Sequence, residues 1–226
     1  MNKVHIKGKR FFATTIAAAF VLALAFTFIS CANNEEEGGG NSSSSGGSNS
    51  DGGYTGSYGS LQYQGQTYKT VKIGTQTWMA ENLNYDVEGS KCYDNDPANC
   101  NKYGRLYDWE TAMSVCPSGW HLPSDDEWTT LENFVSIETA GTKLKASNGW
   151  NDSGNGTDDY GFSALPGGHG GVGGNFILIG SYGNWWCSTE DSASKVYYRA
   201  MDSGYTGVGR DKLHKFFFRS VRCLQD

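Results

Sequence analysis

The sequence CPSGWHLPSDDEW, residues 116–128, carries the strongest local structural signal of this chain. Ser124 and Glu127 form a capping box, because the serine oxygen can accept the amide proton of Glu127 while the glutamate carboxylate reaches back to the serine amide. Asp125 and Asp126 add negative charge at the positive end of the helix that follows. The apolar side chains after the box share one helical face, which consists of Trp128, Leu131, Phe134 and Val135.

The segments on either side of this helix predict an α+β domain. Asp108 can cap a second, earlier helix that runs to Val115 and ends at Pro117. Residues 82–103 are predicted to form a loop. Short aromatic and β-branched segments predict strands at 61–63, 68–73, 76–79, 162–165, 176–179, 184–188, 196–201 and 216–223. The expected architecture combines two early helices with short antiparallel strands and long loops.

The first sixty residues predict export and a linker. A short basic start precedes an apolar stretch at 11–29, as in a secretory signal, although this stretch is also long enough for an uncleaved membrane anchor. The residues before Cys31 resemble the lipobox of bacterial lipoproteins, which implies an acylated Cys31. Residues rich in Asn, Glu, Gly and Ser then predict flexible chain. We therefore expect a signal peptide at 1–30, a lipidated linker at 31–60 and a folded domain at 61–226.

The predicted location is the outer membrane or the cell surface, with the N-terminal lipid holding the protein to the membrane. Three glutamates at 35–37 resemble the acidic tract that some Bacteroidota-type lipoproteins use to reach the cell exterior. A solvated start of the linker explains the same residues. The sequence therefore leaves the periplasmic and exterior faces open.

Composition and charge exclude several classes of protein. The 226 residues include 18 basic and 24 acidic side chains, and four of the basic ones but none of the acidic ones precede Cys31. The acidic balance of the remainder argues against a nucleic-acid partner, which requires a basic face. The content of 31 glycines, 4 prolines and 14% aromatic residues excludes collagen-like and wholly disordered chains.

Five cysteines follow Cys31, and an exported domain with several cysteines predicts disulfide bonds. Two bridges and one free thiol can be chosen in fifteen ways. The segment between Cys92 and Cys100 is rich in turn residues and favours a local bridge. The spacings typical of zinc sites, such as CxxC, do not occur. The other three cysteines are Cys116, Cys187 and Cys223.

Several motifs together resemble one bacterial family. They are QTWMAENLNY, KYGRLYDWETAM, CPSGWHLPSDDEW, YGFSALPGG, WWCSTE and SVRC, and they span the predicted domain. They are similar to the Fibrobacter succinogenes major paralogous domain family, exported domains without an assigned activity. The helical motifs also resemble C-type-lectin-like domains and the sulfatase-modifying (formylglycine-generating) family. The lectin-like resemblance implies a bridge between Cys116 and Cys223. Cys187 stands where serine is expected in the Fibrobacter family, and this resemblance implies that Cys187 is the unpaired thiol.

The sequence gives little support to an enzyme. The formylglycine-generating activity uses a closely spaced pair of copper-binding cysteines near the C-terminus, whereas Cys187 and Cys223 lie 36 residues apart. The GxSxG and HExxH motifs of hydrolases are missing. His121 and His169 have no nucleophile beside them in sequence. The GxGxxG match at 168–173 follows Leu-Pro and precedes no helix, so it predicts a mobile glycine loop rather than a phosphate site.

The acidic loop at 151–159 is the candidate calcium site. Its polar side chains follow part of the spacing of a calcium loop, but Phe162 stands where a bidentate glutamate belongs. The tripeptide WND at 150–152 matches one that supplies calcium and sugar ligands in C-type lectins, although at a different place in the chain. A solvated turn is the alternative. The candidate ligands are Asn151, Ser153, Asn155, Asp158 and Asp159.

Aromatic side chains beside polar loops are candidates for stacking on a sugar ring. Most of the seven tryptophans are expected in the core, whereas Trp150 and Trp185 are expected to be exposed, together with Tyr182 or Tyr205. Two hypotheses of function follow. The first is a surface-displayed module that recognises an extracellular glycan or protein and has no catalytic activity. Calcium is the candidate cofactor of this module. The second is a structural or enzyme-accessory lipoprotein without a ligand of its own.

Overall fold

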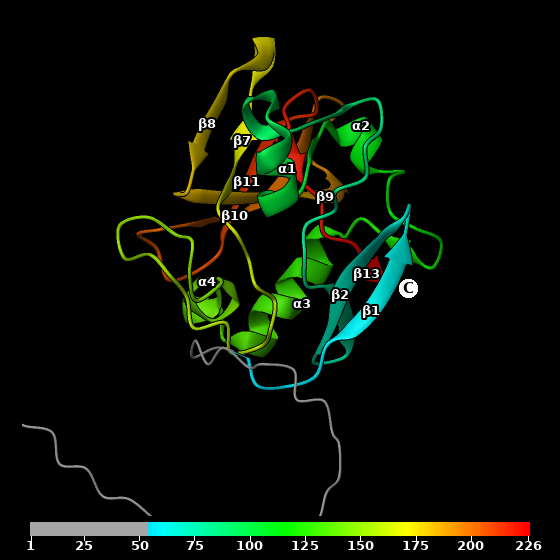
Figure 1. Cartoon of the computed structure of the whole chain (residues 1–226). Coiled ribbons are helices and arrows are strands. Elements are labelled where there is room, and N and C mark those ends of the chain that lie inside the picture. The colour runs from blue at the N-terminus through cyan, green and yellow to red at the C-terminus, as the bar shows by residue number, and fades with distance from the viewer. Residues whose placement is uncertain (1–53) are drawn as a thin grey trace, which may run out of the picture. The chain divides into compact units, whose positions relative to one another are not determined.

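The computed structural model describes residues 54–226. The predicted signal peptide, the lipidation site at Cys31 and most of the predicted linker lie outside these residues. The described part is a mixed α+β domain with two curled sheets and four short α-helices, which confirms the expected class (Figure 1). None of the helices in 54–226 is long and apolar enough to cross a membrane.

The first sheet joins the beginning of the domain to its end. It has five antiparallel strands in the order β1-β2-β3-β13-β6. The C-terminal strand β13 lies between the early hairpin and β6, because Leu224 pairs with Trp78 on one side and with His121 on the other. The strands are β1 (Gly59–Tyr63), β2 (Gln66–Ile73), β3 (Gln76–Met79), β6 (Trp120–His121) and β13 (Leu224–Gln225).

The second sheet has eight strands, and its main path runs β11-β10-β9-β12-β5-β4, with β7 paired to β9 and β8 paired to β7. Most neighbours are antiparallel, as expected, but β12 and β7 both pair with β9 in parallel. The strands are β4 (Ser90–Lys91), β5 (Leu106–Tyr107), β7 (Gly167–Gly170), β8 (Phe176–Ile179), β9 (Tyr182–Glu190), β10 (Lys195–Asp202), β11 (Gly209–His214) and β12 (Arg219–Ser220).

The helices are α1 (Pro97–Tyr103), α2 (Trp109–Ala112), α3 (Asp125–Val135) and α4 (Ala140–Leu144). The capping box of α3 is formed as predicted, since both the serine side chain and the Glu127 carboxylate make their backbone bonds. The Trp128 ring packs between Trp78 and Trp185 in a fully buried aromatic cluster. The helix therefore joins the two sheets through one core.

Two disulfides hold the domain together, as predicted. The bridge from Cys116 to Cys223 ties the segment after α2 to the last strands, 107 residues away. The bridge from Cys92 to Cys100 closes the turn that leads into α1. Cys187 is buried and is the free cysteine of the described residues.

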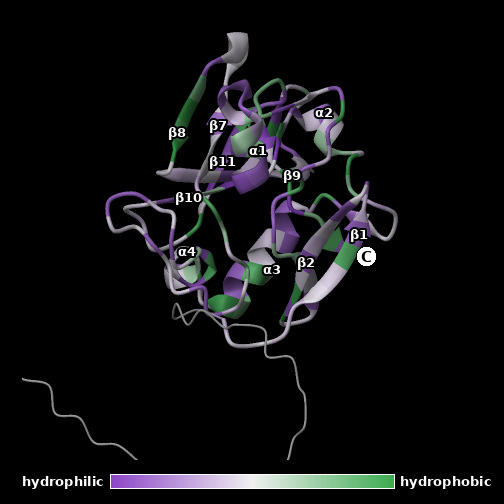
Figure 2. Ribbon diagram, viewed as in Figure 1, coloured by the Kyte–Doolittle hydropathy of each residue, from purple (hydrophilic) through white to green (hydrophobic). Residues whose placement is uncertain are grey.

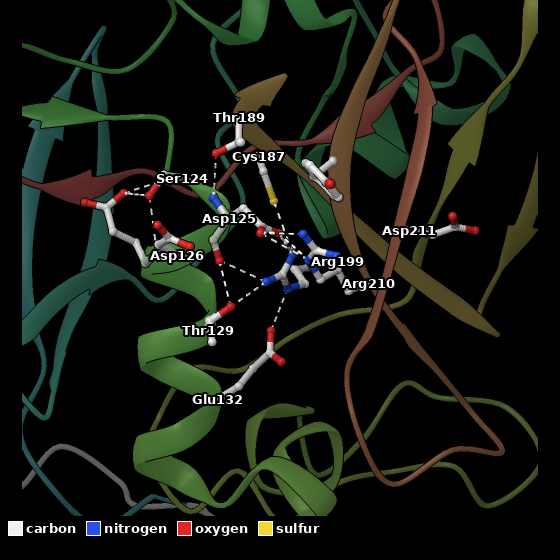
Figure 3. A network of polar contacts seen from close by, with 12 residues as sticks. Ser124, Asp125, Asp126, Thr129, Glu132, Cys187, Thr189, Arg199, Arg210 and Asp211 are labelled. Carbon is white, nitrogen blue, oxygen red and sulfur yellow. Dashed lines mark hydrogen bonds and ion pairs between the residues drawn. The ribbon is translucent and has the colours of Figure 1, made fainter. Parts of the chain in front are cut away.

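A network of charges attaches α3 to the second sheet (Figure 3). Arg199 of β10 is fully buried and donates to Asp125 and Glu132 of α3, with Nε 2.6 Å from the Glu132 carboxylate. Arg210 of β11 binds the same aspartate from the solvent side, 2.7 Å away. The Cys187 sulfur lies 3.8 Å from Arg199, and burial raises the pKa of this thiol to about 12. This thiol therefore stays protonated and has a structural position.

Some local predictions were wrong. The segment predicted as the loop 82–103 contains α1, which Asp96 caps through the Ala98 amide with Pro97 at the first helical position. The predicted helix after Asp108 is only four residues long. The Phe134 side chain is 56% exposed rather than part of the apolar face of α3.

Three predicted β or loop segments also differ. Residues 162–165 form a single bridge, in which Ala164 pairs with Lys145, instead of a strand. The strand expected at 216–223 is reduced to β12, because Phe216 and Phe217 form a turn and Phe218 makes only an isolated bridge with Gly170. The expected mobile loop at 168–173 begins as β7, whose backbone pairs with β8 and β9. Figure 2 shows β8 as a hydrophobic strand at the periphery, where Ile177 and Leu178 are exposed.

Candidate functional site

A polar cleft of about 400 Å³ lies between β2 of the first sheet, the end of α1 and several loops. One side consists of residues 66–69 of β2 and the loop 80–84, and a second side is the end of α1. Loop residues 146–148 complete the cleft together with Asp158, Ser163 and Leu165. Its size falls within the range of small-molecule sites.

Asn82 forms the centre of the floor and is fully bonded. Its side-chain oxygen accepts hydrogen bonds from the Trp185 indole at 2.8 Å and from Arg222 Nε at 3.0 Å. Its amide nitrogen donates to the Tyr103 carbonyl at 2.8 Å. Gly104 makes this approach possible, because a Cβ at that position would lie 2.7 Å from the Asn82 Cβ. The backbone of Gly104 has φ 76°, which also favours glycine.

Arg222 lies beneath Asn82 and is 1% exposed. Its guanidinium donates to the carbonyl oxygens of Phe162 and Ser163, and no carboxylate of residues 54–226 lies within ion-pair distance. Burial lowers the pKa of Arg222 to about 9, although the charge of Asp158 opposes this shift. A buried positive charge held by backbone carbonyls therefore lies beneath the lining of the cleft, in contact with Asn82.

Asp158 supplies the negative charge on the other side of the floor. Its carboxylate accepts hydrogen bonds from the Ser163 amide at 2.7 Å and from the Ser163 hydroxyl at 2.6 Å. Burial raises the pKa of Asp158 despite these bonds and despite the attraction of Arg222. Both charged groups are thus fixed by hydrogen bonds, and the floor is preorganised rather than free to rearrange.

The rim of the cleft is exposed and carries groups of both charges. Lys69 and Lys102 oppose Glu81, whose carboxylate accepts the Lys69 amide proton at 2.6 Å. The side chains of Asn101 and Asn148 are exposed on opposite sides. The rim can therefore both donate and accept hydrogen bonds without a strong preference for one charge, which is the pattern that hydroxyl groups require.

The predicted stacking residues do not form a site. Trp150 is 5% and Trp185 0% exposed, so the expectation that both are exposed was wrong. The reason is that each indole N–H finds an internal acceptor, the Ala164 carbonyl and the Asn82 side chain respectively. Tyr182 is half-buried, and Tyr205 is 53% exposed on a separate loop. The four aromatic side chains do not converge on one cleft.

The predicted calcium loop uses its side chains for its own turns. The Asn155 oxygen accepts the Trp150 amide proton at 2.9 Å, and the Asn151 amide donates to Ser181. Asp158 is buried against Ser163, whereas Ser153 and Asp159 are exposed. No group of three or more His, Cys, Asp or Glu side chains suited to a metal occurs in the described part of the chain. The geometry gives no support to calcium at this loop.

The two histidines considered as candidate bases, His121 and His169, lie apart from the cleft. His121 bridges the carboxylates of Glu127 at 2.9 Å and Asp226 at 2.6 Å; burial opposes its charge, but these bonds raise its pKa. His169 on β7 is half-buried, and burial together with Arg219 lowers its pKa to about 4. Neither histidine contacts a serine or cysteine side chain within residues 54–226.

The sequence analysis did not single out Asn82, Ser163 or Arg222 as site residues. Each lies inside one of the motifs quoted above, NLNY, GFSALP and SVRC respectively. Their occurrence in these motifs was the signal in the sequence that could have identified them as site residues. Only the fold places the three residues beside one another.

The geometry defines the class of protein as a disulfide-bonded α+β domain with a preorganised polar cleft, and the two disulfides are consistent with an extracellular domain. Within this class, the chain belongs to the Fibrobacter succinogenes major domain family, whose profile matches residues 71–225. The resemblance seen in the motifs is thereby confirmed. Comparisons with curated proteins and with solved structures found no match.

Proposed function

We propose that this protein is an exported, lipid-anchored recognition module without catalytic activity, which binds a neutral glycan in the polar cleft. The observation that carries the proposal is the combination of a fully bonded floor with an exposed polar rim. Binding to a preorganised site loses less conformational entropy than binding to a mobile one. The floor bonds of Asn82 and Asp158 provide this rigidity.

The chemistry of the rim supports a neutral ligand. Two lysines oppose Glu81 and Asp158, so an anionic or a cationic ligand meets a like charge as well as an opposite one. Amide and hydroxyl side chains on both walls match the donor and acceptor pattern of a sugar. The absence of catalysis is part of the proposal. The Ser163 hydroxyl donates a hydrogen bond to the Asp158 carboxylate, and we interpret this bond as structural.

The tether and the lectin-like fold belong to the same proposal. The apolar stretch at 11–29 and Cys31 support export and acylation, and the disulfides fit the oxidising compartment that export implies. The lectin-like assignment is supported by the motif resemblance and by the bridge from Cys116 to Cys223. The partners proposed are the membrane, through the lipid, and an extracellular glycan.

A glycan array probed with the full chain in detergent tests this function. We expect retention of neutral glycans, equal in calcium and in chelator. The double variant Asn101→Ala/Asn148→Ala removes one amide from each wall and should weaken binding at least tenfold. Asn133→Ala, an exposed asparagine of α3 outside the cleft, is the matched control and should bind as wild type.

Two outcomes would contradict the proposal. Retention of no glycan would favour the second hypothesis, a structural or enzyme-accessory lipoprotein. An equal loss of binding in Asn133→Ala would show that the cleft is not where the ligand binds. Mass analysis of the mature N-terminus tests the tether separately, since it should find an acylated Cys31.

A further inference from the structure

A second cavity, of about 410 Å³, has a different chemical character from the cleft and shares no lining residue with it. It lies where the loop between β11 and β12 meets the start of α2. Two phenylalanines of this loop, Phe216 and Phe218, form its apolar wall. We call it the aromatic groove.

The aromatic wall is exposed and held in place. Phe216 is 54% exposed, although a phenylalanine at the surface forgoes the gain from burial. Its ring is parallel to that of His214, with centroids 5.2 Å apart and an interplanar angle of 6°. The Phe217 ring also stacks on the Phe216 ring, with centroids 4.9 Å apart. The loop backbone is also fixed, because the Lys215 carbonyl accepts the Trp109 amide proton.

The rim of the groove is polar and mainly acceptor in character. Asp108 and Glu110 contribute carboxylates, and the Glu110 side chain is 75% exposed. Ser194 adds a hydroxyl group. Lys215 is the one lysine in the lining; its amine lies 3.1 Å from Glu190 and 4.3 Å from the centre of the Trp109 ring. Its charge is therefore already engaged by protein groups.

We propose that the aromatic groove is a second ligand site, which takes a neutral pyranose ring. The ligand needs an apolar face for Phe216 and donors for the carboxylates of Asp108 and Glu110. Asp108 already accepts the Thr111 amide proton through one oxygen, and Glu110 lies 3.9 Å from the Lys215 amine. A purely apolar anchor would remove water from the remaining oxygens of these carboxylates without supplying a donor. An anionic ligand would meet two like charges. A pyranose has C–H groups on its faces and hydroxyl donors at its edge, and a ring of this kind fits a cavity of this size.

The site goes beyond the proposed function, because it does not depend on the polar cleft. The chain offers a matched control for its main contact: Phe134 is 56% exposed, compared with 54% for Phe216, but it lies on α3 outside the groove. Both substitutions to alanine remove an exposed ring, so both variants should fold. Thermal unfolding and near-ultraviolet circular dichroism check this.

Isothermal titration of the full chain with hexasaccharides of glucose, mannose and galacturonate tests the proposal. We expect a glucose or mannose hexasaccharide to bind wild type and Phe134→Ala equally, and Phe216→Ala at least tenfold more weakly. The galacturonate hexasaccharide should bind at least tenfold more weakly than the neutral ones, and Glu110→Gln should reduce this difference. The cleft variant Asn101→Ala/Asn148→Ala should retain the component of binding that Phe216→Ala removes.

The proposal is overturned if no neutral hexasaccharide binds, or if Phe216→Ala binds all three as wild type does. Equal losses in Phe134→Ala and Phe216→Ala would also overturn it, because the effect would not be local to the groove. If a cationic peptide binds at Phe216 and the sugars do not, the groove is a peptide site and the pyranose assignment is wrong.

Discussion

Replacing Arg199 by methionine should destabilise the domain strongly while leaving its cavities intact. The guanidinium is fully buried and is the partner of Glu132, whose side chain is only 7% exposed. The variant leaves this carboxylate buried with no ion pair. Breaking a buried ion pair by removal of one partner costs about 3–5 kcal/mol. This is a large share of the roughly 5–15 kcal/mol that stabilises an ordinary domain.

The double variant Arg199→Met/Glu132→Met separates this cost from that of lost packing. Both charges are then replaced by apolar side chains of similar length, and Asp125 retains its contact with Arg210. Because apolar replacement of a whole buried pair is often neutral, most of the lost stability should return. Arg210→Met is the surface control: this side chain is 46% exposed, so its loss should cost less than about 1 kcal/mol.

Urea unfolding of the full chain, followed by tryptophan fluorescence without reductant, measures these differences. The effect of Arg199→Met should be largest at neutral pH and smaller in acid. Burial already raises the pKa of Glu132 in the wild type, against the effect of Arg199, and without the arginine the carboxyl group will bind a proton at higher pH still. A single variant within about 1 kcal/mol of wild type would refute the reasoning, as would a double variant no more stable than the single one.

Three further predictions concern the disulfide bonds, the free thiol and the cleft. From the entropy of loop closure, Cys116→Ser should lower the free energy of unfolding by about 4.8 kcal/mol and Cys92→Ser by about 2.6 kcal/mol. Urea unfolding measures both losses, and a larger loss for Cys92→Ser would contradict the entropic explanation. Cys187 should resist maleimide in the native state and react after unfolding, as mass spectrometry can show, because it is buried and burial raises its pKa to about 12. Burial raises the pKa of Asp158, so ionisation of this carboxyl group destabilises the folded domain. The unfolding free energy of wild type, compared with that of Asp158→Asn, should therefore fall as the pH rises through the pKa of Asp158. A difference between the two proteins that does not change with pH would contradict this prediction.

Local signals in the sequence predicted the parts of the fold that are decided locally. The capping box of α3 acts within four residues, so the sequence alone is sufficient to place the start of the helix. A similar capping signal was present at α1, where Asp96 precedes Pro97. However, the segment has no apolar residues at helical spacing, and its helix is only seven residues long. The bridge from Cys92 to Cys100 closes that segment, and a short closed loop leaves little room for a periodic face.

Burial of the tryptophans could not be predicted from their neighbours in sequence. Trp150 precedes a polar loop, yet its indole N–H donates to Ala164, 14 residues later. Trp185 donates to Asn82, more than a hundred residues earlier. An indole is apolar over most of its surface, so one internal acceptor is enough to make its burial favourable. The acceptor is defined by tertiary structure, and a local polar context therefore gives no information on exposure.

The sequence did not reveal the cleft for the same reason, because the residues that form it are brought together only by the tertiary structure. Asn82 in the floor and Arg222 beneath it form hydrogen bonds with core groups, so their substitution would leave buried groups unpaired. The rim residues Asn101 and Asn148 are exposed and take no part in the hydrophobic core, so their replacement should cost little stability. The same holds for Phe216 in the aromatic groove. In the function we propose, the binding surface and the scaffold use different side chains, so substitutions at the rim alone should change the ligand preference.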